Sequence, residues 1–368
     1  MVDRHQIEFW AHDPLKALVQ VTFLLTLKHK IMEKHEVFIG VDVSKTKLDV
    51  SVVLGADRQL LYHQVYQNNK KGINRILLDI EKRTGILPAS WLFCMEHSGV
   101  YGMPLAYSLT EMKYDYALVP AITIQRSLGM KRGKNDKADS HDIARYACIH
   151  GPDIALYQLP ESALMKLKLL LGHRDRLINS RKMFTTAGKE TGDFLEASIA
   201  SDVVDSSNSV IAMLNAEIKQ ADSQIMELIR SDQTLSEVYD LATSVPGVGP
   251  QTVCHLMVHT RCFTSFDNAR QLACYVGVAP FEYSSGSSIR GKTRVSHMAN
   301  KKLKSLISMG ALNAARFDAE MRQYYQRKVG EGKNAMLVMN AVRNKLLARV
   351  FATVKRGTPY VPMMKFAA

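Results

Sequence analysis

The sequence predicts an α/β domain in the N-terminal part of the chain, followed by a region built almost entirely of helices. Short apolar stretches rich in β-branched residues alternate with amphipathic ones between residues 37 and 160. From residue 161 onward, the spacing of the apolar residues is helical. With 368 residues the chain can hold more than one core, because single cores stop growing at about 250 to 300 residues.

The expected strands and helices of the N-terminal domain follow one another in a regular order. They are strands at 37–44, 48–54 and 60–66, a helix at 72–84, a strand at 91–96, a helix at 101–112, a strand at 116–119 and a helix after Asp139. Three strands joined by short turns form an antiparallel meander, whereas each later strand is followed by a helix. This combination predicts a fold of the ribonuclease H type for residues 37–160, preceded by an N-terminal extension at 1–36.

The rest of the chain is expected to form a helical spacer and a helical C-terminal domain. Residues 161–240 contain no proline and a polar break near 201–209, which predicts two long helices that pack against each other or a second protomer. Residues 241–368 contain a Gly/Ser segment and two further basic amphipathic helices. The segment 244–257, SVPGVGPQTVCHLM, has the pattern of a helix-hairpin-helix, although an ordinary glycine-terminated helix pair shares it.

The composition favours a nucleic-acid partner. The chain has 48 Lys and Arg against 35 Asp and Glu, a formal net charge of +13. Such an excess favours polyanions, because neutralised phosphates release condensed counterions, although anionic membranes or a merely soluble surface also suit a basic balance. The apolar stretch Leu15 to Leu27 contains Lys16 and is shorter than the roughly 20 apolar residues of a membrane span. Five scattered cysteines suit buried free thiols, so we expect a cytoplasmic protein without a membrane anchor.

Four carboxylates stand where acids are unusual or close together. Asp42 interrupts the apolar strand VFIGVDVS and Glu96 ends the apolar strand WLFCME, and a buried charge is costly unless it is paired or binds a cation. Asp139 and Asp142 lie three residues apart at the start of a helix, so they project from one face. Taken singly, Asp42 is equally explained by a solvent-facing strand end and Asp139 by a helix N-cap. Taken together, the four acids predict a site for two Mg²⁺ ions that stabilise the attacking and leaving oxygens of a phosphoryl displacement.

Two further segments are candidates for contact with DNA phosphates. The first is the basic loop before the helix of Asp139, with the cations Lys131, Arg132, Lys134 and Lys137. A solvated basic loop is the alternative explanation of these residues. The second is the SVPGVG turn, where backbone N–H groups at Gly247 and Gly249 can hold a phosphate at a helix N-terminus.

A serine-rich segment, YSSGSSIRGKTR at 283–294, is a candidate for covalent chemistry. Its serines are followed by Arg290, Lys292 and Arg294. A hydroxyl beside fixed positive charge suits attack on a phosphate, since guanidinium groups stabilise the charge of the transition state. A Gly/Ser surface linker has the same composition, so the segment alone leaves both interpretations open.

A zinc site near residue 255 is less favoured. His255 and His259 are four residues apart, with Cys254 and Cys262 nearby. The segment lacks both the Glu that a zinc protease needs and a CxxC spacing. A buried helix face is therefore the better explanation.

As an ordered set, these motifs resemble the DEDD-type transposases of the insertion-sequence-110 family, the site-specific recombinases of bacterial mobile elements. The motifs are FIGVDVSKTKLDV with Asp42, CMEHSGVYG with Glu96, KNDKADSHDIA with Asp139 and Asp142, SVPGVG, and LACYVGVAPFEYSSGSSIRGKTRVSHMANKKLK. The likeness extends over nearly the whole chain from Val37. It implies a RuvC-like N-terminal domain at 37–160 with an Asp-Glu-Asp-Asp tetrad, a coiled-coil spacer at 161–240 and a transposase domain at 241–368.

The resemblance also implies roles that the residues alone leave open. Matching the family's S-G-S-S segment places the nucleophile at Ser285, which would attack DNA to form a phosphoserine intermediate, with Ser284, Ser287 and Ser288 as neighbouring hydroxyls. The family implies a noncoding guide RNA encoded by the element. It also implies dimers and tetramers in which the metal domain of one protomer completes the serine site of another. Family members begin only a few residues before the first strand, so the extension before Met32 departs from the pattern.

Residues and resemblance together predict a Mg²⁺-dependent DNA recombinase that excises and inserts its element. A structure-selective nuclease of the Holliday-junction type is the alternative, in which the tetrad would activate water and no covalent adduct would form. A non-catalytic DNA-binding protein would keep the basic helices but has no use for four converging acids.

Overall fold

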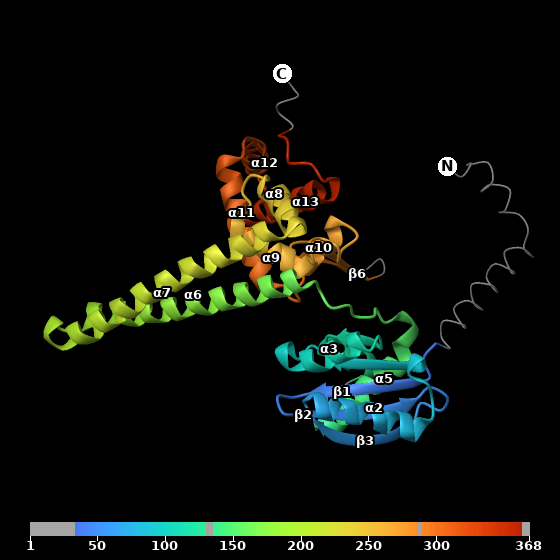
Figure 1. The fold of residues 1–368 in the computed structure, drawn as a ribbon. Helices are drawn as coiled ribbons and strands as arrows, with labels where there is room; N and C mark the ends of the chain where they lie inside the picture. The colour runs from blue at the N-terminus through green and yellow to red at the C-terminus, as the bar shows by residue number, and fades with distance from the viewer. Residues whose placement is uncertain (1–33, 130–134, 286–288, 363–368) are drawn as a thin grey trace, which may run out of the picture. The chain divides into compact units, whose positions relative to one another are not determined.

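Figure 1 shows the computed structural model of the chain, which describes residues 34–129, 135–285 and 289–362. The chain divides into two compact units, Met1–Leu159 and Pro160–Ala368. Several predicted positions lie outside the described residues: most of the extension at 1–36, and Lys131, Arg132, Lys134, Ser287 and Ser288. None of the described helices is long and apolar enough to cross a membrane.

The first unit contains a five-stranded sheet. Its strands are β1 (Val37–Val43), β2 (Lys47–Leu54), β3 (Leu60–Gln67), β4 (Trp91–Glu96) and β5 (Asp115–Val119), in the spatial order β3-β2-β1-β4-β5. Strands β1, β2 and β3 pair antiparallel, whereas β4 pairs parallel with both β1 and β5. The predicted α/β class and three-strand meander are therefore confirmed.

Helices cover both faces of this sheet. They are α2 (Lys70–Thr84), α3 (Met103–Glu111), α4 (Ala121–Leu128) and α5 (Asp136–His150). Ile73 of α2 and Leu105 of α3 pack with Ile39 on one face, whereas Ile124 of α4 and Ile143 of α5 pack on the other. Because successive strand residues point to opposite faces, a strand covered on both faces needs an unbroken apolar run, which VFIGV and WLFCM provide.

Two boundaries in this unit differ from the prediction. Helix α4 lies between the predicted strand at 116–119 and the predicted basic loop, where no helix was expected, and α5 begins at Asp136 rather than after Asp139. Asn135 is the N-cap of α5, because its side-chain oxygen accepts a hydrogen bond from the Ala138 N–H at 2.7 Å. Asp139 is thus the fourth residue of the helix, and the N-cap interpretation of this residue was wrong.

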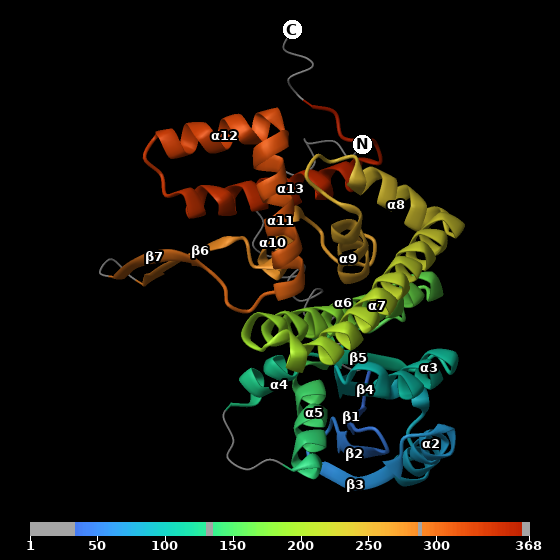
Figure 2. The same cartoon turned by 90° about the vertical axis from the view of Figure 1, so that its left-hand side faces the viewer.

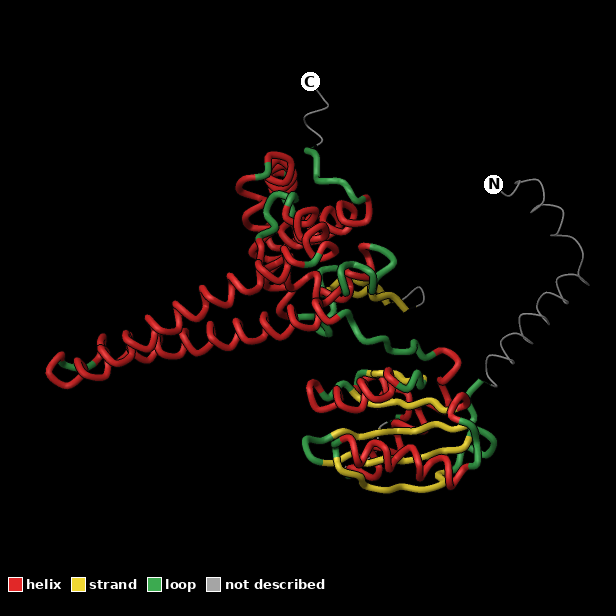
Figure 3. The backbone as a smooth tube through the Cα atoms, in the orientation of Figure 1, coloured by secondary structure: helices red, strands yellow, loops and turns green. Residues whose placement is uncertain are grey.

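The second unit begins with two long helices, α6 (Ser162–Phe194) and α7 (Ala197–Ser231), which lie side by side in Figure 3. The predicted polar break near 201–209 was wrong, because these residues are helical and the chain reverses at 195–196. Ser207 is buried and packs over Gly188 of α6, where a Cβ would lie 3.3 Å from the Ser207 Cβ. Small residues here allow the two helices to approach closely. The Ser-rich composition of 201–209 therefore belongs to a contact between helices, not to a break in one.

The remainder of the second unit is a helical bundle with one β-hairpin. Its elements are α8 (Gln233–Thr243), α9 (Pro250–Thr260), α10 (Ala269–Val276), β6 (Pro280–Ser285), β7 (Ile289–Val295), α11 (Lys301–Phe317), α12 (Ala319–Gly330) and α13 (Ala335–Arg356). Strands β6 and β7 pair antiparallel and extend from the helices in Figure 2. The helical region is confirmed, but the Gly/Ser segment includes the ends of two paired strands, and in the described part of the chain three helices, not two, follow it.

Candidate functional site

Two of the predicted acids stand at neighbouring positions on one edge of the sheet. The parallel strands β1 and β4 pair Val41 with Met95, so the next residues along the strands are Asp42 and Glu96. Val41 and Met95 are fully buried in the core that faces α2 and α3. Because side chains alternate along a strand, Asp42 and Glu96 belong to the opposite face, which α4 and α5 cover. Both acids are partly exposed there.

Helix α5 crosses this face in direct contact with β1. A Cβ at Gly40 would overlap the carbonyl oxygen of Ser140 and the backbone nitrogen of Ala144. The Ser140 hydroxyl is also 2.8 Å from the hydroxyl of Ser51 on β2, and both side chains are buried. Glycine at position 40 therefore lets the helix backbone lie on the strand, two residues before Asp42.

The other two predicted acids belong to the first half of α5. Asp139 immediately precedes Ser140, and Asp142 lies three residues further along the helix; both are partly buried. Asp136 and Asp139 are the acidic residues of the first turn, where the helix dipole favours negative charge. The packing of Ser140 on Gly40 brings this turn to the sheet edge that carries Asp42.

The side chains of the four acids are not gathered into a ligand set. Among the described residues, no group of three or more His, Cys, Asp or Glu side chains is arranged so that it could hold a metal ion. Four carboxylates repel one another unless a cation lies between them. Their donor atoms are all carboxylate oxygens, which are the ligands that Mg²⁺ and similar hard cations prefer. Donor chemistry and backbone placement thus fit a divalent cation at this edge.

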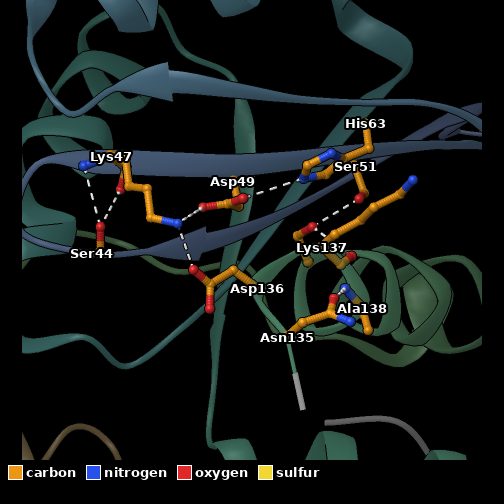
Figure 4. A network of polar contacts seen from close by, with 10 residues as sticks. Ser44, Lys47, Asp49, Ser51, His63, Asn135, Asp136, Lys137 and Ala138 are labelled. Atoms are coloured by element: carbon orange, nitrogen blue, oxygen red, sulfur yellow. Dashed lines mark hydrogen bonds and ion pairs between the residues drawn. The ribbon is translucent and has the colours of Figure 1, made fainter. Parts of the chain in front are cut away.

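A fifth acid, Asp49, lies beside the tetrad and was missed in the sequence. It pairs directly with Asp42 across β1 and β2, and its side chain is 4% exposed. Lys47 Nζ lies 3.1 Å from Asp49 and 2.5 Å from Asp136, and Nε2 of His63 lies 3.3 Å from Asp49. Figure 4 shows how these side chains face one another. The signal that singled out Asp42, an acid inside an apolar strand, is also present in the β2 sequence KLDVSVVL.

The one basic-loop residue that the structure describes is Lys137. It lies in the first turn of α5 and is exposed, while its backbone carbonyl accepts a hydrogen bond from the Ser140 hydroxyl at 3.1 Å. An exposed lysine beside the acids remains compatible with a phosphate contact. Its predicted role is untested by the geometry.

In the second unit, Gly247 and Gly249 lie in the turn between α8 and α9. Gly247 has φ +89°, and a Cβ there would lie 2.8 Å from the Gly310 carbonyl oxygen. Gly249 is the N-cap of α9. Together with Asn313 and Arg316 of α11, both glycines line a cavity of about 600 Å³. The helix, turn and helix are present, and a DNA contact at this turn stays a prediction.

The histidines near this turn make protein contacts. His255 is buried, and burial lowers its pKa to about 4. Nδ1 of His259 lies 3.1 Å from the side-chain nitrogen of Asn300 and 3.3 Å from the hydroxyl of Tyr275. These contacts agree with the preference for a buried helix face over a zinc site.

Ser285 is the last residue of β6, at the end of the hairpin away from the helices. Its backbone pairs with Ile289 of β7, and Ser284 pairs with Arg290. Arg290, Lys292 and Arg294 occupy alternate positions of β7, and Arg294 pairs with Phe281 and is exposed. The register therefore places the basic strand directly beside the serine strand.

Comparison with known proteins gives two family matches that cover different parts of the chain. Residues 239–326 match a model described as "Transposase IS116/IS110/IS902 family". Residues 39–188 match a transposase model for the DEDD type of IS110. The first match contains Ser285 and the second contains the four acids.

Individual relatives agree with these matches. The chain is 27% identical over 328 residues to the pilin gene-inverting protein of Moraxella bovis, covering 88% of this chain and 97% of that protein. It is 32% identical over 162 residues to an uncharacterized 43.6 kDa protein of insertion element IS110 from Streptomyces coelicolor, covering 44% and 39%. A solved structure of T. thermophilus RuvC in complex with a Holliday junction substrate aligns with 33% of this chain and all of that chain, at 16% identity and a TM-score of 0.27. That last likeness is too slight to support an argument.

Proposed function

Because the chain belongs to the transposases of the IS116/IS110/IS902 family, which cleave and rejoin DNA, we propose that it excises and inserts an insertion sequence with a carboxylate metal site and a serine nucleophile. One observation carries the metal part of this proposal. Asp42 and Glu96 share one edge and one face of the sheet, and α5 brings the turn of Asp139 onto that face over Gly40.

The proposed ligands are Asp42, Glu96, Asp139 and Asp142. Two Mg²⁺ ions bound there would supply charge stabilisation for the attacking and leaving oxygens. The protein's own contribution is to hold the acids on a rigid support, with two of them on adjacent strands and two on a helix packed against those strands. A rigid support matters because small displacements of positioned groups reduce the rate steeply.

The proposed nucleophile is the hydroxyl of Ser285. It loses its proton and attacks phosphorus, the bond from phosphorus to one deoxyribose oxygen breaks, and that oxygen leaves with a proton. The resulting phosphoserine ester is later attacked by a hydroxyl of another strand, which restores the serine and rejoins the DNA. Arg290, Lys292 and Arg294 on the paired strand would stabilise the charge that develops on the phosphate oxygens.

The partner of this family is DNA, and we further propose a guide RNA and a homodimer or tetramer, as the family resemblance implies. The net charge of +13 supports binding to either nucleic acid. Proposed phosphate contacts are Lys131, Arg132, Lys134, Lys137, Gly247 and Gly249. Exposed apolar residues near the turn between α6 and α7, such as Phe194 (84% exposed) and Ile199 (67% exposed), support a protomer contact there.

The test is denaturing electrophoresis of the protein with labelled element-end DNA, guide RNA and Mg²⁺. We expect a covalent adduct that is lost in Ser285→Ala and kept in Ser284→Ala. Asp42→Ala should abolish cleavage, whereas Asp153→Ala, at an exposed position of the same unit, should retain it. An adduct in Ser285→Ala would show that the nucleophile is wrong. Metal-dependent cleavage without any adduct would support the structure-selective nuclease, and binding without cleavage the non-catalytic protein.

A further inference from the structure

The first turn of α5 needs to be held accurately, because it carries Asp139 and leads to Asp142. The turn begins at Asp136, after the N-cap Asn135. Two side-chain contacts join it to strand β2. One is the buried contact between Ser140 and Ser51, and the other is the contact of Asp136 with Lys47.

Lys47 also contacts a buried acid. Asp49 is 4% exposed, and a carboxylate removed from water is costly unless a positive charge or hydrogen bonds accompany it. The Lys47 ammonium lies 3.1 Å from Asp49. Asp49 pairs with Asp42 in the sheet, so the ammonium links the neighbour of Asp42 on β2 to the first turn of α5.

The backbone of Lys47 is itself fixed by the turn that follows Asp42. The Ser44 N–H donates to the Lys47 carbonyl at 3.0 Å, and the Ser44 hydroxyl donates to the same oxygen at 2.9 Å. The Lys47 N–H in return donates to the Ser44 hydroxyl oxygen at 3.2 Å. Figure 4 shows this short loop next to the contacts of the ammonium. A lysine anchored in this way can transmit the position of the β1–β2 turn to α5.

We propose that Lys47 is a positioning residue of the candidate metal site: by bridging Asp49 and Asp136, it holds the first turn of α5, and with it Asp139, in place beside Asp42. This inference rests on the proposed function of the four acids. Lys47 and Asp136 are both substantially exposed, and exposed ion pairs add little to stability. The bridge therefore acts on the placement of the turn more than on the free energy of unfolding.

The sign of one measurement separates this role from a simple effect of charge. Removing a positive charge beside a cation site strengthens cation binding by Coulomb's law. If Lys47 positions Asp139, removing it weakens cation binding instead. Groups that support metal ligands typically contribute about 10- to 100-fold to metal affinity, so Lys47→Met should raise the Kd for Mn²⁺ by about tenfold.

The experiment uses the full chain without DNA, with Mn²⁺ binding followed by isothermal titration calorimetry. We expect weaker binding in Lys47→Met and in Asp136→Asn, no further loss in the double variant, and recovery in Lys47→Arg. Lys82→Met, which removes an exposed lysine of α2, is the matched control and should bind as the wild type does. Amide hydrogen exchange in residues 136–142 of the metal-free protein should accelerate in Lys47→Met and return to the wild-type rate in Lys47→Arg.

Two results would overturn the proposal while leaving the metal site intact. One is unchanged or tighter Mn²⁺ binding in a folded Lys47→Met variant. The other is unchanged hydrogen exchange in residues 136–142 of that variant. In contrast, if the Asp42→Ala variant binds Mn²⁺ as the wild type does, the proposed metal site itself is wrong. Failure of the inference and failure of the proposed function are therefore distinguishable.

Discussion

Gly40→Ala should destabilise the first unit and disturb the candidate site at the same time. The added Cβ would overlap the Ser140 carbonyl oxygen and the backbone nitrogen of Ala144. These are backbone atoms of α5, so no side-chain rotation can relieve the overlap. The helix must shift or β1 must bend, and either movement displaces Asp139 from Asp42.

The magnitude follows from the kind of contact. Overpacking a core typically costs about 1–3 kcal/mol, and a clash with helix backbone belongs at the upper end of that range. Replacing glycine in a strand recovers roughly 0.5–1 kcal/mol of backbone entropy, so the net loss is about 2 kcal/mol. With a urea m-value of about 2 kcal/mol/M, the unfolding midpoint should fall by about 1 M.

The assay is urea unfolding followed by tryptophan fluorescence. The chain has two tryptophans, and in a Trp10→Phe background the signal comes from Trp91, which is buried in the core of the first unit. Gly55→Ala is the matched control, because its Cβ would lie 3.1 Å from a Phe38 side-chain atom and no closer than 3.4 Å to any backbone atom, whereas the Cβ at position 40 would overlap backbone. A Gly40→Ala midpoint equal to that of the control, with unchanged Mn²⁺ binding, would refute the close-packing argument.

Three further predictions each concern a single buried side chain. Burial lowers the pKa of His255 from 6.5 to about 4, so between these values the unfolded chain binds a proton that the folded chain does not. The free energy of unfolding of the second unit should therefore fall by up to about 3 kcal/mol as pH drops through that window, which urea titrations at pH 7 and 4.5 can measure. If the His255→Gln variant keeps the pH dependence of the wild type, His255 is not its cause. Ser140→Ala leaves the buried Ser51 hydroxyl without its 2.8 Å partner and should cost about 1–3 kcal/mol by urea unfolding; adding Ser51→Ala should cost little more, and additive losses would argue against the pair. Asp318 caps α12 by accepting from the Met321 N–H at 2.7 Å, so Asp318→Ala should cost about 1 kcal/mol in thermal unfolding, and an equal loss in Asp318→Asn would rule out capping as the cause.

The succession of strands and helices along the first unit was predictable, because each element depends on a local pattern. Strands buried on both faces need unbroken apolar runs, and VFIGV and WLFCM are such runs. Asp42 and Glu96 interrupt or end these runs, which is why they stood out as candidates. Their assignment as ligands remains a prediction, and so does the role of Ser285.

Other features could not be predicted because they depend on contacts between distant residues. The Ser- and Asp-rich stretch at 201–209 has the composition of a loop, yet it is helical, and Ser207 within it packs against Gly188 of the neighbouring helix. The Gly/Ser segment has the composition of a surface linker, whereas its first and last residues belong to the paired strands β6 and β7. Composition reports local preference, and tertiary contacts overrode it in both places.

For the four acids, too, local sequence and tertiary structure decide different things. The sequence by itself determined that Asp42, Glu96, Asp139 and Asp142 are candidates, because the cost of burying a charge and the spacing of a helix are properties of short segments. Only the tertiary structure decided that Asp42 and Glu96 share an edge and a face, that Gly40 admits α5, and that Asp49 lies across from Asp42. Strand register and helix packing join residues up to about a hundred positions apart, and no local pattern specifies such pairs.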